Sequence, residues 1–131
     1  MNVIELHDVS KAYGDELVLD RLDLEVAAGE VFCLLGPNGA GKTTAVEIME
    51  GYRRADSGRV RALGFDPVGV GAGFRSRIGI VLQQTTAFER STVRETIQMF
   101  AALFPSPMPV AEAIGLVGLA AQADRIADTM S

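Results

Sequence analysis

The first thirty residues contain two segments whose apolar and polar positions follow the pattern of β-strands. Residues 22–26 alternate apolar and charged side chains, as a strand with one face in water does, and residues 3–9 are also strand-like. Turn-forming residues at 10–15 interrupt the pattern, so we expect two strands of an antiparallel layer. Residues 31–35 are apolar throughout, which is typical of a parallel strand covered on both faces. We predict that this segment is the central strand and that its cysteine, Cys33, is buried.

A helical pattern follows. Apolar residues at i, i+3, i+4 and i+7 predict a helix that opens at Lys42, packs one face on the sheet and ends at Gly51; these residues are Ala45, Ile48, Met49 and Tyr52. A turn at 56–58 then leads into a short strand at 59–63 and a glycine-rich loop at 64–73. A second buried strand is predicted at 78–82.

The last forty residues read as helical. Thr92 and Glu95 have the spacing of a capping box, which predicts a helix over 92–104 with Val93, Ile97, Phe100 and Phe104 on one face. Prolines between 105 and 109 stop that helix, because each lacks a backbone donor. A second amphipathic stripe follows at 110–117, and residues 122–127 are expected to start a third helix.

Residues 36–44 fill the template G-x-x-x-x-G-K-[ST] completely, directly after the apolar segment 31–35. Glycines in such a turn allow positive φ, so that backbone amides converge on phosphate oxygens at the N-terminus of a helix. Lys42 is expected to reach the β- and γ-phosphates, and the Thr43 hydroxyl to complete the coordination of Mg²⁺. The motif predicts binding of a nucleoside triphosphate with magnesium; a purely structural glycine corner is the alternative. The predicted nucleotide contacts within the motif are Asn38, Gly39, Ala40, Gly41, Lys42, Thr43 and Thr44.

Composition limits the partners. The net charge of −5 and the scattered lysines and arginines argue against nucleic acid, which usually meets a clustered basic face. The single cysteine favours a reducing, cytoplasmic compartment. No segment approaches the ~18 consecutive apolar residues that a membrane-spanning helix needs. Any membrane association is therefore expected to come through a partner.

With these motifs the chain resembles the ATP-binding subunit of an ABC transporter. The amino-acid sequences of residues 36–44 and 51–58 are similar to those of multidrug and ABC-2 type exporters. The family's adenine-stacking aromatic residue corresponds to Tyr13, with Val18 flanking the same pocket; packing of the antiparallel layer is the alternative role for Tyr13. The family's glutamine loop corresponds to Gln83, which would ligate magnesium or orient a water near the γ-phosphate. Gln84 is the alternative register.

The resemblance implies an α/β fold: a P-loop NTPase core with an N-terminal antiparallel β layer and the beginning of the ABC-type helical subdomain, in truncated form. We expect the core and glutamine loop in residues 1–90 and the partial helical subdomain in 91–131. The family implies ATP and Mg²⁺ as cofactors, a head-to-tail dimer of ATPase subunits, and a separate membrane permease. It also implies a location on the cytoplasmic face of the membrane.

The resemblance reaches only the start of the family's Leu-Ser-Gly-Gly-Gln signature, since Ser131 looks like its serine and Met130 stands in place of the leucine. The signature glycines, the catalytic glutamate and the switch histidine follow later in the family. We therefore expect Lys42 and Gln83 to serve an ATPase in the parent protein, and this chain alone to bind nucleotide weakly with negligible hydrolysis. The alternatives are a soluble ABC-type ATPase of translation or DNA repair, and a binding-only nucleotide module.

Overall fold

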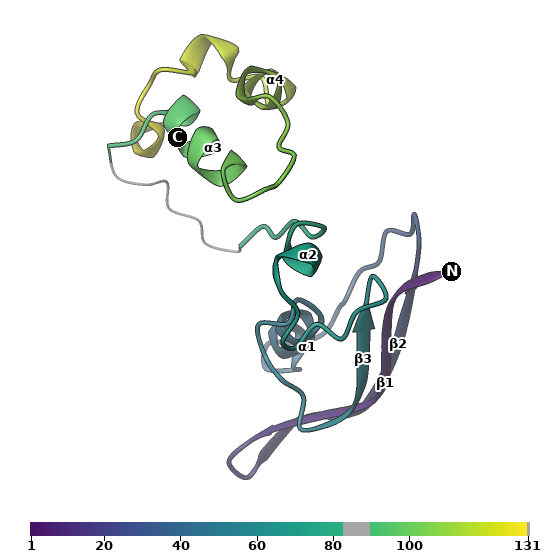
Figure 1. Cartoon of the computed structure of the whole chain (residues 1–131). Coiled ribbons are helices and arrows are strands. Elements are labelled where there is room, and N and C mark those ends of the chain that lie inside the picture. Colours follow the sequence, from purple (N-terminus) through teal and green to yellow (C-terminus); the bar gives the residue numbers. More distant parts are fainter. Residues whose placement is uncertain (83–89, 131) are drawn as a thin grey trace. The chain divides into compact units, whose positions relative to one another are not determined.

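The computed structural model describes residues 1–82 and 90–130, which belong to two units, Met1–Ile78 and Gly79–Ser131. Figure 1 shows the first unit with its strands and the helices α1 and α2, and the second with the helices α3 and α4. The assignment of residues 1–90 to a nucleotide-binding core and of residues 91–131 to a partial helical subdomain stays a prediction.

The first unit is built on an antiparallel sheet of three strands in the order β2-β1-β3 (Figure 1). β1 (Asn2–Tyr13) and β2 (Glu16–Ala27) form a long hairpin, and β3 (Ser57–Ala62) pairs with the other edge of β1. The predicted antiparallel layer and the short strand near 59–63 are thereby confirmed. The interruption predicted at 10–15 was too wide: β1 runs on to Tyr13, and only Gly14, with φ of 59°, and Asp15 form the turn.

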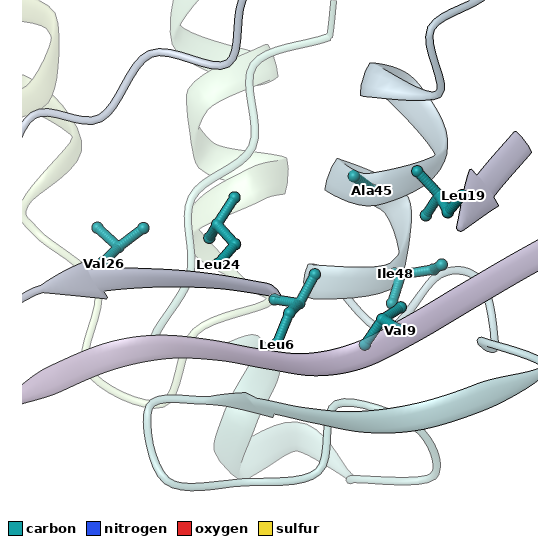
Figure 2. Packing of buried hydrophobic residues seen from close by; sticks show 7 residues of the cluster. All are labelled: Leu6, Val9, Leu19, Leu24, Val26, Ala45 and Ile48. Atoms are coloured by element: carbon teal, nitrogen blue, oxygen red, sulfur yellow. The ribbon is translucent and has the colours of Figure 1, made fainter. Parts of the chain in front are cut away.

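Helix α1 (Lys42–Met49) covers one face of this sheet (Figure 2). The alternation of β1 and β2 places their apolar side chains on the same side, where they meet the buried residues of α1. Ala45 and Ile48 are each only 1% exposed, as the helical stripe predicted. The cluster consists of Leu6, Val9, Leu19, Leu24, Val26, Ala45 and Ile48.

Tyr52 does not extend this stripe. The helix ends at Met49, and Gly51 with φ of 75° turns the chain, so that Tyr52 is 79% exposed. The predicted end at Gly51 was nearly correct, and the prediction that Tyr52 packs on the sheet was wrong. The 3.6-residue spacing predicts which face a side chain occupies only within the helix, and Tyr52 lies beyond its end.

The two predicted buried strands are not strands in the described part of the chain. Residues 31–35 and 78–82 are irregular, and Val31, Leu35 and Val81 are 93%, 88% and 96% exposed. Cys33 is exposed as well, which corrects its predicted burial. Their apolar composition favours a strand only where neighbouring strands complete its hydrogen bonds, and no described strand pairs with either segment.

After β3, the glycine-rich segment 64–73, predicted as loop, leads into a short helix, α2 (Ala72–Arg75), which takes up its last two residues. Phe74 of α2 is 1% exposed, and its ring centroid lies 6.1 Å from that of Phe65. This aromatic pair anchors α2 in the first unit.

The second unit contains α3 (Val93–Ala101), α4 (Val110–Leu116) and two 3₁₀ turns, η1 (Ala120–Gln122) and η2 (Ala127–Thr129). Its small core consists of Val93, Ile114 and Ala123. The capping box is confirmed: the Glu95 amide donates to the Thr92 hydroxyl at 3.2 Å, and the Thr92 amide donates to the Glu95 carboxylate at 2.9 Å.

The predicted helices of this unit were too long. α3 stops at Ala101, three residues before the predicted end, and Phe100 and Phe104 are 48% and 40% exposed instead of joining the core. Residues 122–127 form no α-helix: Gln122 ends η1, Ala127 begins η2, and the residues between them form a turn and a bridge from Ile126 to Thr92. Within the described residues no helix has the length and apolar character needed to cross a membrane.

Candidate functional site

The glycine-rich loop lies where the chain enters α1, in the first unit. Gly39 and Gly41 have φ of 84° and 78°, the left-handed conformation that only glycine adopts without strain. Gly41 is the N-cap of α1. The structure describes every residue of this first turn, and among them no side chain caps the helix and none is acidic. The first amides of α1 have no acceptor within the helix, so they present hydrogen-bond donors and the positive end of the helix dipole to an anion.

Gly41 also brings the loop against β2. A Cβ atom at this position would lie 2.7 Å from the Val18 carbonyl oxygen and 2.7 Å from Leu19 Cδ2. Only glycine permits such an approach. The structure thus places Val18, a predicted pocket residue, directly beside the glycine-rich loop.

Lys42 folds over the loop that precedes it. Its ammonium donates to the carbonyl oxygens of Gly36 at 2.7 Å and Pro37 at 2.6 Å. The loop is closed further by the Ala40 amide, which donates to the Pro37 carbonyl at 3.3 Å. The lysine charge is therefore held against the backbone at the start of the loop.

Tyr13 lies beside the same helix start. Its hydroxyl oxygen is 3.5 Å from that of Thr44, at the outer limit of a hydrogen bond, and Thr44 is only 8% exposed. Tyr13 itself is 40% exposed. The structure thus brings Tyr13 beside Thr44 and Val18 beside Gly41, at the start of the same helix, and their role as a base pocket stays a prediction.

The remaining predicted contacts divide into two groups. Asn38, Gly39, Ala40 and Thr43 lie on the loop and the first helical turn with at least part of their surface open to a ligand. Gln83, with its alternative Gln84, lies outside the described residues. The described residues contain no cluster of three or more His, Cys, Asp or Glu that would hold a metal on its own. An accessible Thr43 suits Mg²⁺, since this ion usually keeps several waters and binds through substrate phosphates with few protein ligands.

Four charged residues near Tyr13 were missed by the sequence analysis. The Arg53 Nε donates to Glu47 at 2.6 Å, and the Lys11 ammonium donates to Asp56 at 2.6 Å. Both cations lie over the Tyr13 ring, the Arg53 Cζ at 5.2 Å and the Lys11 Nζ at 5.6 Å from its centroid. Opposite charges six residues apart across the end of α1 were a weak signal for the first pair. The second pair joins residues far apart in the sequence and left no signal.

These ion pairs shift the pKa values of their members. The hydrogen bond to Glu47 raises the pKa of the Arg53 guanidinium above its usual value, so it remains a cation. The hydrogen bond from Lys11, aided by one from the Ala12 amide, lowers the pKa of the Asp56 carboxyl. Arg53 and Asp56 therefore keep their charges at neutral pH.

Residues 19–131 match the protein family described as ABC transporter. The chain is 45% identical over 102 residues to the Nod factor export ATP-binding protein I of Sinorhizobium fredii, covering 77% of this chain and 29% of that protein. It is 41% identical over 100 residues to the daunorubicin resistance ATP-binding protein DrrA3 of Streptomyces coeruleorubidus, covering 76% and 32%.

The fold matches solved structures as well. One of them, described as the ATP-binding subunit of an ABC transporter, superposes with a TM-score of 0.85 at 21% identity, over 98% of this chain and 56% of that chain. The chain thus spans about a third of the length of these curated relatives and just over half of this solved chain.

Proposed function

The chain belongs to the ABC transporter family, and on that premise we propose that it supplies the phosphate- and base-binding part of an ATP-binding subunit. The observation that carries the proposal is the loop geometry at α1: two left-handed glycines, an uncapped helix start and the Lys42 ammonium at one place. Such a site suits a polyphosphate, because several amides and one cation act on the same anion.

Each predicted residue has a role in this proposal. The amides of residues 38–44 and the Lys42 ammonium bind the phosphates, while Tyr13 and Val18 receive the base. Thr43 and Gln83 contribute oxygen ligands to Mg²⁺, which neutralises charge on the phosphates when bound. Gln83 also orients the attacking water in the hydrolysing protein.

In the whole protein, ATP binding and hydrolysis would drive transport through a separate membrane permease at the cytoplasmic face of the membrane. Two ATPase subunits would form a head-to-tail dimer around the nucleotides. The names of the relatives, which refer to Nod factor export and daunorubicin resistance, favour an exporter. They give no support to a role in translation or DNA repair.

Binding of ATP with Mg²⁺, measured by calorimetry on the wild type and Lys42→Ala, tests the proposal. We expect the variant to bind about ten- to a hundredfold more weakly, because a hydrogen bond to a charged group contributes roughly 1.5–3 kcal/mol. Arg59→Ala is the charge-matched control, since Arg59 is exposed on β3. Equal affinity of Lys42→Ala and Arg59→Ala, or no binding by the folded wild type, would refute the proposed site.

Phosphate release is a separate measurement. For the whole protein we expect ATP hydrolysis that Lys42→Ala abolishes. For this chain alone we expect none above that variant, because phosphoryl transfer needs metal, water and positioned charges acting together. Clear turnover by the isolated chain would contradict the composite site.

A further inference from the structure

The aromatic ring of Tyr13 is partly covered by other side chains of the protein. Two cations lie over it: the Arg53 Cζ is 5.2 Å from the ring centroid and the Lys11 Nζ is 5.6 Å from it. Each cation is held by its own carboxylate at 2.6 Å, Arg53 by Glu47 and Lys11 by Asp56. The ring that the proposed function assigns to the base is thus already in contact with groups of the protein.

A stacked base does not fit between the ring and either cation. Carbon atoms in contact are about 3.5–4.0 Å apart, so a base with partners on both sides needs about 7–8 Å between them. The observed 5.2 Å and 5.6 Å are too short for this. Where a base and one of these cations approach the same ring face, one excludes the other.

Arg53 is the cation that can move at less cost. Lys11 is fixed on β1, its side chain is 16% exposed, and its partner Asp56 also accepts from the Ala12 amide at 2.8 Å. Arg53 follows the end of α1, its side chain is 34% exposed, and the carboxylate that holds it, Glu47, lies on the same segment of chain. Rotation of the Arg53 side chain therefore leaves the sheet and the helix undisturbed.

We propose that Arg53, held by Glu47, covers the Tyr13 ring and that a nucleotide base must displace it in order to stack there. Arg53 is then a positioning residue that weakens binding of the base and leaves binding of the phosphates unchanged. The inference rests on the proposed function, because it takes Tyr13 as the stacking surface. A cation–π contact open to solvent corresponds to about a two- to fivefold factor in affinity, and we expect at least this effect for the partly exposed Arg53.

The test compares ATP with tripolyphosphate, which has the phosphates but no base, by calorimetry on the folded full chain. The ratio of the two affinities cancels the general effect of removing a positive charge from the protein. We expect Arg53→Leu to raise this ratio at least about two- to fivefold. The matched control is Arg54→Leu, which removes a neighbouring cation and should leave the ratio unchanged.

The effect must also depend on the ring. In a Tyr13→Leu background, Arg53→Leu should no longer change the ratio. If Arg53→Leu fails to fold, Arg53→Gln removes the charge while keeping a donor for Glu47, and the same rise is expected. An unchanged or lowered ratio, or a rise that persists without Tyr13, overturns the inference. The proposed function fails separately, by an absence of ATP binding or of its dependence on Lys42.

Discussion

Gly41→Ala is a substitution for which the structure gives a definite expectation. Gly41 combines a left-handed backbone, with φ of 78°, and a close approach to β2. A Cβ atom would be 2.7 Å from the Val18 carbonyl oxygen, which belongs to the backbone of a strand and does not move easily. Leu19 Cδ2, equally close, belongs to a residue that is only 6% exposed and has little space to move into.

The magnitude follows from two separate costs. A left-handed conformation costs a residue with a Cβ about 1–2 kcal/mol. Overpacking against a fixed neighbour costs about 1–3 kcal/mol more. Gly39→Ala isolates the first cost, because Gly39 has φ of 84° but a Cβ added there would meet no atom within 4 Å. We therefore expect Gly41→Ala to lower the free energy of unfolding by about 2–5 kcal/mol and Gly39→Ala by about 1–2 kcal/mol.

Urea unfolding followed by far-ultraviolet circular dichroism measures both values under the same conditions. The chain has no tryptophan, so circular dichroism is a better probe than indole fluorescence. Equal losses for the two variants would show that the loop does not approach β2 as described. A larger loss for Gly39→Ala would contradict the contact at Gly41 as well.

Two further expectations concern α1 and α3. Ile48→Ala should lower the free energy of unfolding by about 2–5 kcal/mol, because the Ile48 side chain is buried. Tyr52→Ala should change it by less than about 0.5 kcal/mol, because the Tyr52 side chain is exposed. Urea unfolding measures both values, and equal losses would contradict the assigned end of α1. The hydrogen bonds from Thr92 lower the pKa of Glu95, so its stabilisation is present above the unfolded value near 4.5 and is lost as pH falls through the lower folded pKa. Glu95→Gln should remove this part of the acid dependence of the thermal midpoint, and an unchanged pH profile would argue against the capping box.

Features with a local cause could be predicted from the sequence. The glycine motif placed the start of α1 at Lys42, because the conformations it requires are properties of consecutive residues. Thr92 and Glu95 likewise fixed the start of α3, since their hydrogen bonds are made within one turn. The alternation in residues 22–26 identified β2, because successive side chains of a strand point alternately to the solvent and to the core.

Features that depend on distant partners could not. The apolar composition of residues 31–35 and 78–82 predicted buried strands, but composition does not say whether neighbouring strands are present to pair with them. The helical spacing that reached Tyr52 and Phe104 did not reveal where the hydrogen bonds of each helix stop. The pairing of Lys11 with Asp56 depends on the approach of a loop to β1, so it appears only once the chain is folded.

The two bonds from the Lys42 ammonium to Gly36 and Pro37 have a consequence for every substitution at this residue. A ligand that draws the ammonium away returns two carbonyl oxygens to water, so the heat released on binding is a difference between two sets of hydrogen bonds. Removing the lysine changes the loop's own closure together with its charge. Affinities of Lys42 variants are thus best compared well below the melting temperature of each, where altered loop order is not confused with partial unfolding.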